Sequence, residues 1–486
     1  MWKGTKNIEP SDSTIMTNNI NRRSFLKTLT AGTAATAAAL VGCKRTSDNA
    51  SDDYTQQVEP PKGKMTYRLN PSTHDRVSLL GYGMMRLPTI GDSKNKKGDA
   101  PLDQEMIDKL VDYAIDHGVN YFDTSPAYCQ GQSERATGLA LKRHPRKDFF
   151  IATKLSNFAE ETWSRQASIE MYHESFRQLQ VDHIDYYLLH AVGMGGFEKF
   201  RKRYVDNGII DFLVEERKAG RIRNLGFSFH GDVEAFNWLM QHHDQYHWNF
   251  CQIELNYLDW DYANEINDSN TDARILYGEL QKRGIPAVIM EPLLGGRLAN
   301  IPQFLAARLK QREPERSIAS WAFRYAGSHK DVLTVLSGMT YMEHLKDNLI
   351  NYCPLKPLTA DDEKMLYAMA KEIFGLNTIP CNDCKYCMPC PWGVDIPGVF
   401  THYNKCINEG TLPHDEQNED YARYRRQYLI GLDRVVPRDR QPDHCIGCGH
   451  CLPHCPQSIQ IPQEMNRLTD FIDHLKRGDL VKKTEA

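Results

Sequence analysis

The chain has 486 residues, of which 41% are hydrophobic, and this is enough to bury one large core and a second, smaller one. Its formal net charge of -4 gives no general attraction to nucleic acid or to an anionic membrane, so we predict no nucleic-acid role. After residue 43 no stretch approaches about 18 uninterrupted apolar residues, and we expect the remainder of the chain to be soluble.

Residues 1–43 are predicted to be a targeting segment outside the fold. Asn21–Lys27 (NRRSFLK) precedes a mildly apolar stretch, Thr28–Val41, that is too short for an ordinary membrane span. It resembles a twin-arginine export signal, which implies a periplasmic location or one on the outer face of the membrane. Leu40–Cys43 resembles a bacterial lipobox, which implies lipidation of Cys43 and a membrane anchor. An ordinary signal peptide with an incidental Cys is the alternative.

Residues 44–65 are rich in Ser, Asp, Gln, Pro and Lys and have almost nothing to bury, so they are predicted to be a flexible tether. From 66 to 357, short apolar runs alternate with amphipathic segments such as Asp103–His117. The runs are Val77–Leu80, Tyr121–Asp123, Phe149–Lys154, Ile184–His190, Ile222–Ser228, Phe250–Leu255, Pro286–Met290 and Val332–Leu336. This alternation predicts an α/β fold, the (β/α)8 TIM barrel. An open doubly wound sheet is the alternative, but no Gly-x-Gly-x-x-Gly follows the first run.

Ionisable side chains stand at the ends of three consecutive runs. The second run ends on Asp123 and is followed by Tyr128, the third ends on Lys154, and the fourth on His190. Each residue alone is more often structural than functional. Because all carboxyl ends of a barrel's strands meet on one face, the four together predict an active site.

In this order the four residues resemble the Asp, Tyr, Lys, His tetrad of the aldo-keto reductase superfamily. The resemblance implies an enzyme that reduces a small-molecule carbonyl or oxidises an alcohol. Tyr128 would give the proton, and Lys154, held by Asp123, would lower the pKa of that phenol toward working pH. His190 would orient the carbonyl oxygen.

The resemblance extends to segments that bind a nicotinamide cofactor, NAD(P), in that family. It implies that Ser228 and Gln252 bind the carboxamide, and that the loops after strands seven and eight, with Leu293, Gly338 and Asn348, hold the pyrophosphate and adenosine. The chain departs from the pattern at Phe229, where Asn is usual, and at Met290, where an aromatic ring usually stacks on the nicotinamide. Residues 337–342 also lack the basic residue expected to pair with the 2′-phosphate of NADP.

Residues 358–486 contain two runs of four cysteines. The runs are Cys381, Cys384, Cys387 and Cys390, and Cys445, Cys448, Cys451 and Cys455; a Pro follows the last Cys of each. The second run has the spacing of bacterial ferredoxins, which predicts a small, mainly helical, ferredoxin-type domain with [4Fe-4S] clusters, two rather than one. By analogy with two-cluster ferredoxins, Cys455 would complete the first set and Cys390 the second. Disulfides and zinc are the alternatives.

The joined architecture resembles aldo-keto reductases with a C-terminal ferredoxin domain. We expect electrons to pass through the clusters, with any nicotinamide kept bound as a relay, because an exported protein meets no pool of NADPH. The electron partner would be a redox protein or a quinone-linked donor. An iron–sulfur electron-transfer protein without enzyme activity, in which the barrel is only a scaffold, is the alternative.

Overall fold

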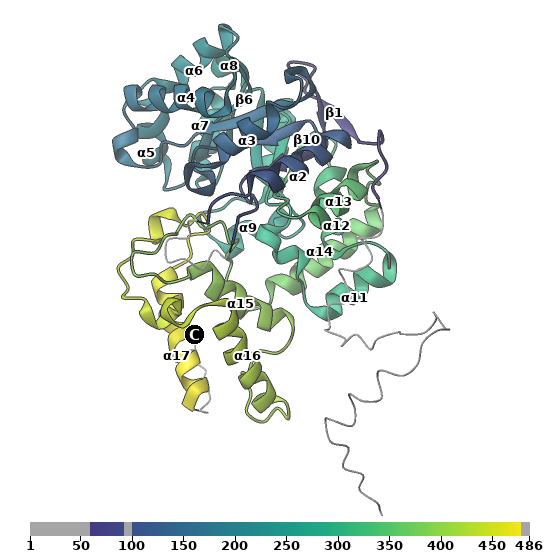
Figure 1. Ribbon diagram of the computed structural model, residues 1–486, viewed down its shortest axis with the longest axis vertical. Coiled ribbons are helices and arrows are strands. Elements are labelled where there is room, and N and C mark those ends of the chain that lie inside the picture. Colours follow the sequence, from purple (N-terminus) through teal and green to yellow (C-terminus); the bar gives the residue numbers. More distant parts are fainter. Residues whose placement is uncertain (1–58, 92–99, 478–486) are drawn as a thin grey trace, which may run out of the picture. The chain divides into compact units, whose positions relative to one another are not determined.

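Eight parallel strands close into a barrel in the computed structural model, which describes residues 59–91 and 100–477 (Figure 1). The strands are β3 (Leu80–Gly83), β4 (Tyr121–Asp123), β5 (Phe150–Leu155), β6 (Ile184–Val192), β7 (Ile222–Phe229), β8 (Phe250–Glu254), β9 (Ala287–Met290) and β10 (Val332–Ser337). They pair in sequence order, and β10 closes onto β3. The predicted (β/α)8 barrel is confirmed. The predicted targeting segment, its Cys43 and residues 44–58 of the tether lie outside the described residues.

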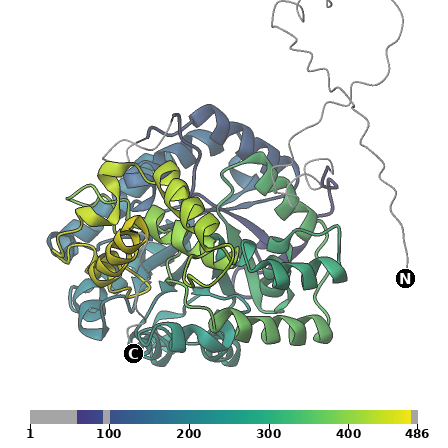
Figure 2. The same ribbon diagram turned by 90° about the horizontal axis from the view of Figure 1, so that it is seen from below.

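Helices surround the barrel (Figure 2). They are α2 (Gln104–Asp116), α3 (Ser133–Leu141), α4 (Arg165–Leu179), α5 (Phe197–Phe200), α6 (Ile209–Lys218), α7 (Val233–Gln241), α8 (His243–Tyr246), α9 (Asp259–Ile266), α10 (Ala273–Lys282), α11 (Gln303–Arg312), α12 (Ile318–Ser328) and α13 (Met342–Tyr352). The Asp103 carboxylate caps α2 by accepting the Met106 amide at 3.0 Å. Since helices cover the outer faces of the strands, those strands are apolar on both faces, which is why they read as continuous runs.

The first predicted strand, Val77–Leu80, is wrong in its bounds. Arg76–Ser78 is β2, which pairs antiparallel with β1 (Tyr67–Leu69) outside the barrel, whereas the barrel strand begins at Leu80. The hairpin contacts the barrel interior, where the Tyr186 hydroxyl donates to Asp75 at 3.1 Å. Val77 packs in the same interior cluster as the barrel strands, so an apolar run cannot distinguish the two roles.

The C-terminal region is mainly helical, with α15 (Ile396–Asn408), α16 (Tyr421–Val435) and α17 (Ile461–Arg477) side by side (Figure 1). These helices bury a core of their own, separate from the barrel's and including Phe400, Leu432 and Leu468. By contrast, α14 (Ala360–Phe374) packs Leu366 and neighbouring residues into the core of the barrel. All described residues belong to one compact unit. Within residues 59–91 and 100–477, no helix combines the length and the apolar character needed to cross a membrane.

Candidate active site

Asp123 and Lys154 form a buried ion pair at the ends of adjacent strands. The Lys154 Nζ atom donates to the Asp123 Oδ1 atom at 2.6 Å and to the Thr124 carbonyl oxygen at 2.8 Å. Burial raises the pKa of Asp123 and lowers that of Lys154, and the attraction between the two charges opposes both shifts. At this short distance the ammonium and the carboxylate hold each other in place, and truncation of either residue would leave a buried charge unpaired.

Tyr128 follows β4 in a tight turn, where Cys129 and Gln130 adopt left-handed φ values of 49° and 54°. The Lys154 Nζ atom lies 4.8 Å from the centroid of the Tyr128 ring. The expected lowering of the Tyr128 pKa is not found, because burial raises the pKa of this phenol well above its ordinary value. Lys154 already donates to Asp123 and Thr124. Tyr128 is therefore a neutral phenol that carries the proton a general acid would give.

His190 is buried in β6 and fixed through one ring nitrogen. Its Nδ1 atom lies 2.6 Å from the Ser156 hydroxyl and 3.3 Å from that of Ser125. Burial lowers the pKa of His190 well below its ordinary value, and the Lys154 charge adds to the shift, so the imidazole is neutral. If Nδ1 accepts the Ser156 proton, Nε2 keeps its hydrogen and can donate to a ligand. The Tyr128 and His190 rings are 5.8 Å apart and near perpendicular.

A cavity of about 690 Å³ contains three of the four tetrad residues. It is lined by Asp123, Tyr128 and His190, and also by Ser228, Gln252, Leu293, Gly338 and Asn348, all five of the residues predicted to bind a nicotinamide. The Gln252 Oε1 atom is buried without a hydrogen-bond partner, as expected of an acceptor that awaits a ligand. The size of the cavity and its donor set fit a dinucleotide.

The two single-residue departures from the family pattern have different surroundings. Met290 lines the cavity and accepts a hydrogen bond from Gln252 Nε2 on its sulfur at 3.3 Å. Phe229 instead packs against Phe236, with ring centroids 5.2 Å apart, in the core between barrel and helices. Only Met290 therefore alters the surface that a cofactor would meet.

The first cysteine run contributes three residues to the same cavity: Asn382, Cys384 and Tyr386. Cys384 and Tyr386 line it together with Tyr128 and His190, and Tyr386 is a side-chain hydrogen-bonding neighbour of Tyr128. Phe158 packs against both Tyr386 and His190, with ring centroids 6.2 and 4.9 Å away. Sequence reasoning missed Tyr386, and the only signal for it was its place between Cys384 and Cys387.

Residues of the barrel loops hold this cysteine loop in place. The Arg86 guanidinium, just after β3, donates to the Asn382 carbonyl oxygen at 2.8 Å and to the Asp383 carboxylate at 3.1 Å. A Cβ atom at Gly295 would lie only 2.0 Å from the Asn382 carbonyl oxygen, so this close approach requires glycine. The contact between the cysteine loop and the barrel mouth therefore depends on both Arg86 and Gly295.

Sequence reasoning also missed two further acidic residues of the cavity, Glu254 and Glu291. Glu254 and Glu291 line it at the ends of β8 and β9, and the Glu254 Oε1 atom lies 3.1 Å from the His230 Nδ1 atom. Burial raises the pKa of Glu291 to about 7, and the nearby Glu254 charge adds to the rise. Their positions directly at strand ends were the available signal.

The eight cysteines of the two runs lie close enough to influence one another, and Cys387 has neighbours from both runs: Cys381 and Cys384 from the first, Cys451 and Cys455 from the second. Burial raises the pKa of the Cys381 thiol to about 12, and Cys455 adds to the rise. Burial likewise raises the pKa of Cys451 to about 11, where the further contributors are Cys445, Cys390 and Cys448. Among the described residues, no group of three or more His, Cys, Asp or Glu is arranged to hold a single metal ion. In a [4Fe-4S] cube each of the four thiolates binds a different iron atom, so the ligands need not converge on one point. Two sets of four thiols therefore fit two cubes.

Comparison with known proteins defines this barrel as an oxidoreductase. The "Aldo/keto reductase family" matches residues 79–371, the "4Fe-4S dicluster domain" matches 380–459, and the twin-arginine translocation signal matches 19–39. The chain therefore belongs to the aldo/keto reductase family and is an enzyme of that type. It also carries an iron–sulfur domain and a twin-arginine export signal, both as predicted.

The relatives are distant. An L-galactose dehydrogenase of Arabidopsis thaliana is 23% identical over 318 residues, which are 62% of this chain and 92% of that protein. An NADH-specific methylglyoxal reductase of Escherichia coli is 25% identical, over 57% of this chain and 90% of its own. A solved aldo-keto reductase from Bacillus halodurans has a TM-score of 0.49 and 24% identity over 63% of this chain and 96% of its own.

Proposed function

We propose that this enzyme interconverts a carbonyl and an alcohol at Asp123, Tyr128, Lys154 and His190, and that the electrons pass through [4Fe-4S] clusters in its tail. One observation carries the proposal: Cys384 and Tyr386, from a cysteine run, line the same cavity as three residues of the tetrad. A cluster bound by Cys384 would therefore stand beside the reacting atoms. In a soluble reductase with an exchangeable cofactor, this contact would have no use.

The chain's own residues supply the proton and hold the substrate oxygen. In the reducing direction the carbonyl carbon gains a hydride, and its oxygen gains the proton of the Tyr128 hydroxyl. The neutral His190 donates from Nε2 to the same oxygen, because Nδ1 is held by Ser156. Lys154, paired with Asp123, then stabilises the phenolate that remains on Tyr128. In the oxidising direction the phenolate takes the proton back.

A nicotinamide, when bound, would supply or accept the hydride. Ser228, Gln252, Leu293, Gly338 and Asn348 would hold it, and the unpartnered Gln252 oxygen supports a carboxamide there. Glu343 and Asp347 also line the cavity, close in sequence to Asn348. Because acidic side chains repel a 2′-phosphate, we propose NAD rather than NADP.

The cysteine groups support two clusters with crossed ligand sets. One cube would use Cys381, Cys384, Cys387 and Cys455, and the other Cys445, Cys448, Cys451 and Cys390. Each cube carries one electron at a time, so two cubes match the two electrons of carbonyl reduction.

The same reasoning extends to domain bounds and location. We propose that the barrel domain runs through α14, since that helix packs into its core, instead of ending at 357. We also propose that Cys43 is lipidated after export, so that the protein works at a membrane surface. There it would exchange electrons with a redox protein or a quinone-linked donor.

The test uses the clusters as the reporter. The chain from residue 44 is purified without oxygen, and iron, sulfide and bound nicotinamide are counted. A panel of sugar and aromatic alcohols is then added, and bleaching of the clusters' visible absorption is followed; matching carbonyls are added to dithionite-reduced protein. We expect about eight iron atoms and a response that Tyr128→Phe slows by about 100-fold or more. Tyr424→Phe, at a half-buried position of α16 that does not line the cavity, is the control. Full iron without bound nicotinamide and without any response would favour the electron carrier.

A further inference from the structure

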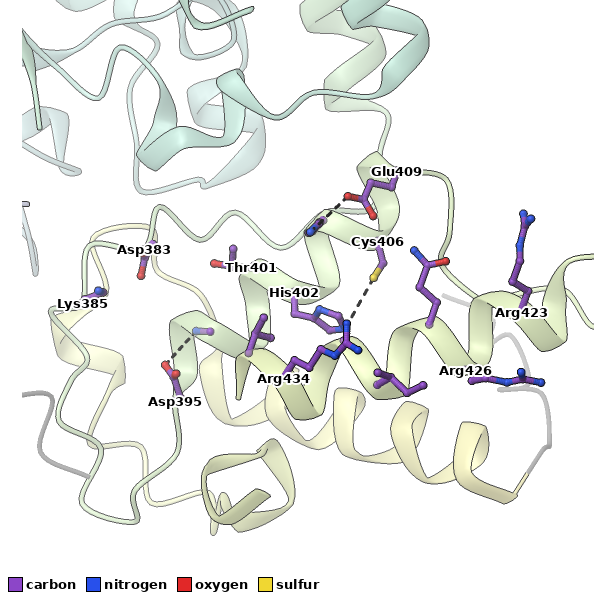
Figure 3. Close-up of a pocket in the computed structure, with 16 residues that line it drawn as sticks. Asp383, Lys385, Asp395, Thr401, His402, Cys406, Glu409, Arg423, Arg426 and Arg434 are labelled. Carbon is purple, nitrogen blue, oxygen red and sulfur yellow. Dashed lines mark hydrogen bonds and ion pairs between the residues drawn. The ribbon is translucent and has the colours of Figure 1, made fainter. Parts of the chain in front are cut away.

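A second large hollow lies entirely within the cysteine-rich tail, outside the cavity of the active site. It is a groove of about 880 Å³ between α15 and α16 (Figure 3). Figure 3 shows Asp383 and Lys385 at one end, Arg423 and Arg426 at the other, and Arg434 beside His402 between them. No part of the proposed carbonyl chemistry uses this groove.

The groove is positively charged, although the whole chain has a net charge of -4. Its basic residues are Lys385, Lys405, Arg423, Arg426 and Arg434, and its acidic residues are Asp383, Asp395 and Glu409. All three acids have a partner. Asp383 pairs with Arg86 at 3.1 Å, Asp395 accepts a hydrogen bond from the Gly398 amide at 3.1 Å, and Glu409 pairs with Lys405 at 3.7 Å. Within the described part of the chain, Lys385, Arg426 and Arg434 have no hydrogen bond or ion pair with another side chain, so their charges are available to a partner.

One face of α16 combines these charges with exposed apolar side chains. Arg426, Ile430 and Arg434 are spaced four residues apart, which puts them on the same side of the helix. Ile430 is 45% exposed and Val435 51% exposed, and both line the groove. Arginine around exposed apolar residues is the composition of protein interfaces. A small anion would use the charges but would leave the apolar side chains in water.

The other end of the groove reaches the first cysteine run. Asp383 and Lys385 flank Cys384 in sequence, and both line the groove. A protein seated there would lie beside a cluster bound by Cys384. Short distance and complementary charge are what a fast, transient electron-transfer encounter needs.

We propose that this groove docks an acidic electron-transfer protein, which exchanges single electrons with the cluster bound at Cys384. In each encounter the reduced cluster loses one electron and the oxidised centre of the partner gains it, with no bond made or broken. The proposal rests on the iron–sulfur domain and not on the carbonyl chemistry. An enzyme inactive on every carbonyl would therefore leave it intact.

The test measures the rate of electron transfer from dithionite-reduced protein to two probes, acidic cytochrome b5 and basic cytochrome c, by stopped flow. The ionic strength is raised from about 0.01 M to about 0.2 M, over which the Debye length falls from about 30 Å to less than 10 Å. Arg426→Glu/Arg434→Glu reverses two charges in the groove. Lys364→Glu/Lys371→Glu makes the same change in net charge on exposed positions of α14, outside the groove.

We expect the rate with cytochrome b5 to fall as salt rises, and to fall about tenfold or more in the groove pair at low salt. The α14 pair should stay near the wild-type rate, and the groove pair should not slow cytochrome c. Arg426→Gln/Arg434→Gln should give a smaller loss, and iron content and the electron paramagnetic resonance signal should be unchanged. The proposal would be overturned if the rate with cytochrome b5 fell equally in the groove pair and the α14 pair, or fell in neither. The proposal would also be overturned if the groove pair lost binding to phosphatidylglycerol vesicles but kept its rate with cytochrome b5. That result would indicate that the groove binds a lipid surface.

Discussion

Gly295→Ala tests the contact between the cysteine loop and the barrel mouth. The new Cβ atom would lie 2.0 Å from the Asn382 carbonyl oxygen, whereas ordinary contacts begin at 3.4 Å, so the loop must retreat by about 1.4 Å. That movement would break the 2.8 Å bond from Arg86 to the same oxygen. Loss of a hydrogen bond to a charged group costs about 1.5 to 3 kcal/mol.

Gly296→Ala is the matched control. Both glycines have positive φ values, 66° and 104°, and Gly296 lies further from the left-handed region that other residues can adopt, so the control substitution strains the backbone at least as much. Nothing lies within 4 Å of a Cβ atom at Gly296, so its replacement leaves Asn382 in place. The difference between the two variants therefore isolates the contact with the loop.

The assay is the rate at which the anaerobic protein releases iron to a ferrous chelator, together with its melting temperature. A weakening by 1.5 to 3 kcal/mol raises the population of the undocked loop by about 10- to 150-fold. We expect Gly295→Ala to release the iron of one cluster faster than Gly296→Ala by a factor of that order. Equal release from the two variants would refute the docking of the loop on Gly295.

Three further predictions concern the tetrad and the clusters. Burial lowers the pKa of His190, so below about pH 6.5 the unfolded chain binds a proton that the folded protein does not. The contribution of His190 to the free energy of unfolding should therefore fall as pH decreases, by up to about 1.4 kcal/mol per pH unit. His190→Asn should flatten that dependence in urea titrations, and an unchanged slope would contradict the buried neutral imidazole. Lys154→Met should cost about 3 to 5 kcal/mol by leaving Asp123 unpaired, and adding Asp123→Asn should restore part of it in thermal scans. Cys455→Ala should lower the iron count from about eight to about four, while the buried Cys406→Ala should leave it unchanged.

Much of the fold and of the candidate site could be predicted from the sequence, because the signals were local. Strands buried on both faces must be apolar. The ionisable residues Asp123, Lys154 and His190 at the ends of such strands were therefore recognisable as exceptions, although all three are buried. Cysteines that bind an iron–sulfur cluster are spaced two or three residues apart along the chain, so the pattern can be recognised from the sequence alone. The limit of this local information is visible at Val77, where an apolar run belongs to a hairpin outside the barrel.

The tertiary structure decided whatever depends on residues that are distant in the chain. Burial of Tyr128 by its whole surroundings raises its pKa, against the expectation drawn from Lys154 alone. Tyr386 reaches the cavity because its loop packs on barrel residues that lie far earlier in the chain, among them Arg86 and Gly295, some 90 to 300 residues away. The groove likewise joins α16 to the first cysteine run. Local spacing determines which element a segment forms and which ligands it offers, whereas charge, burial and access arise from packing among many segments at once.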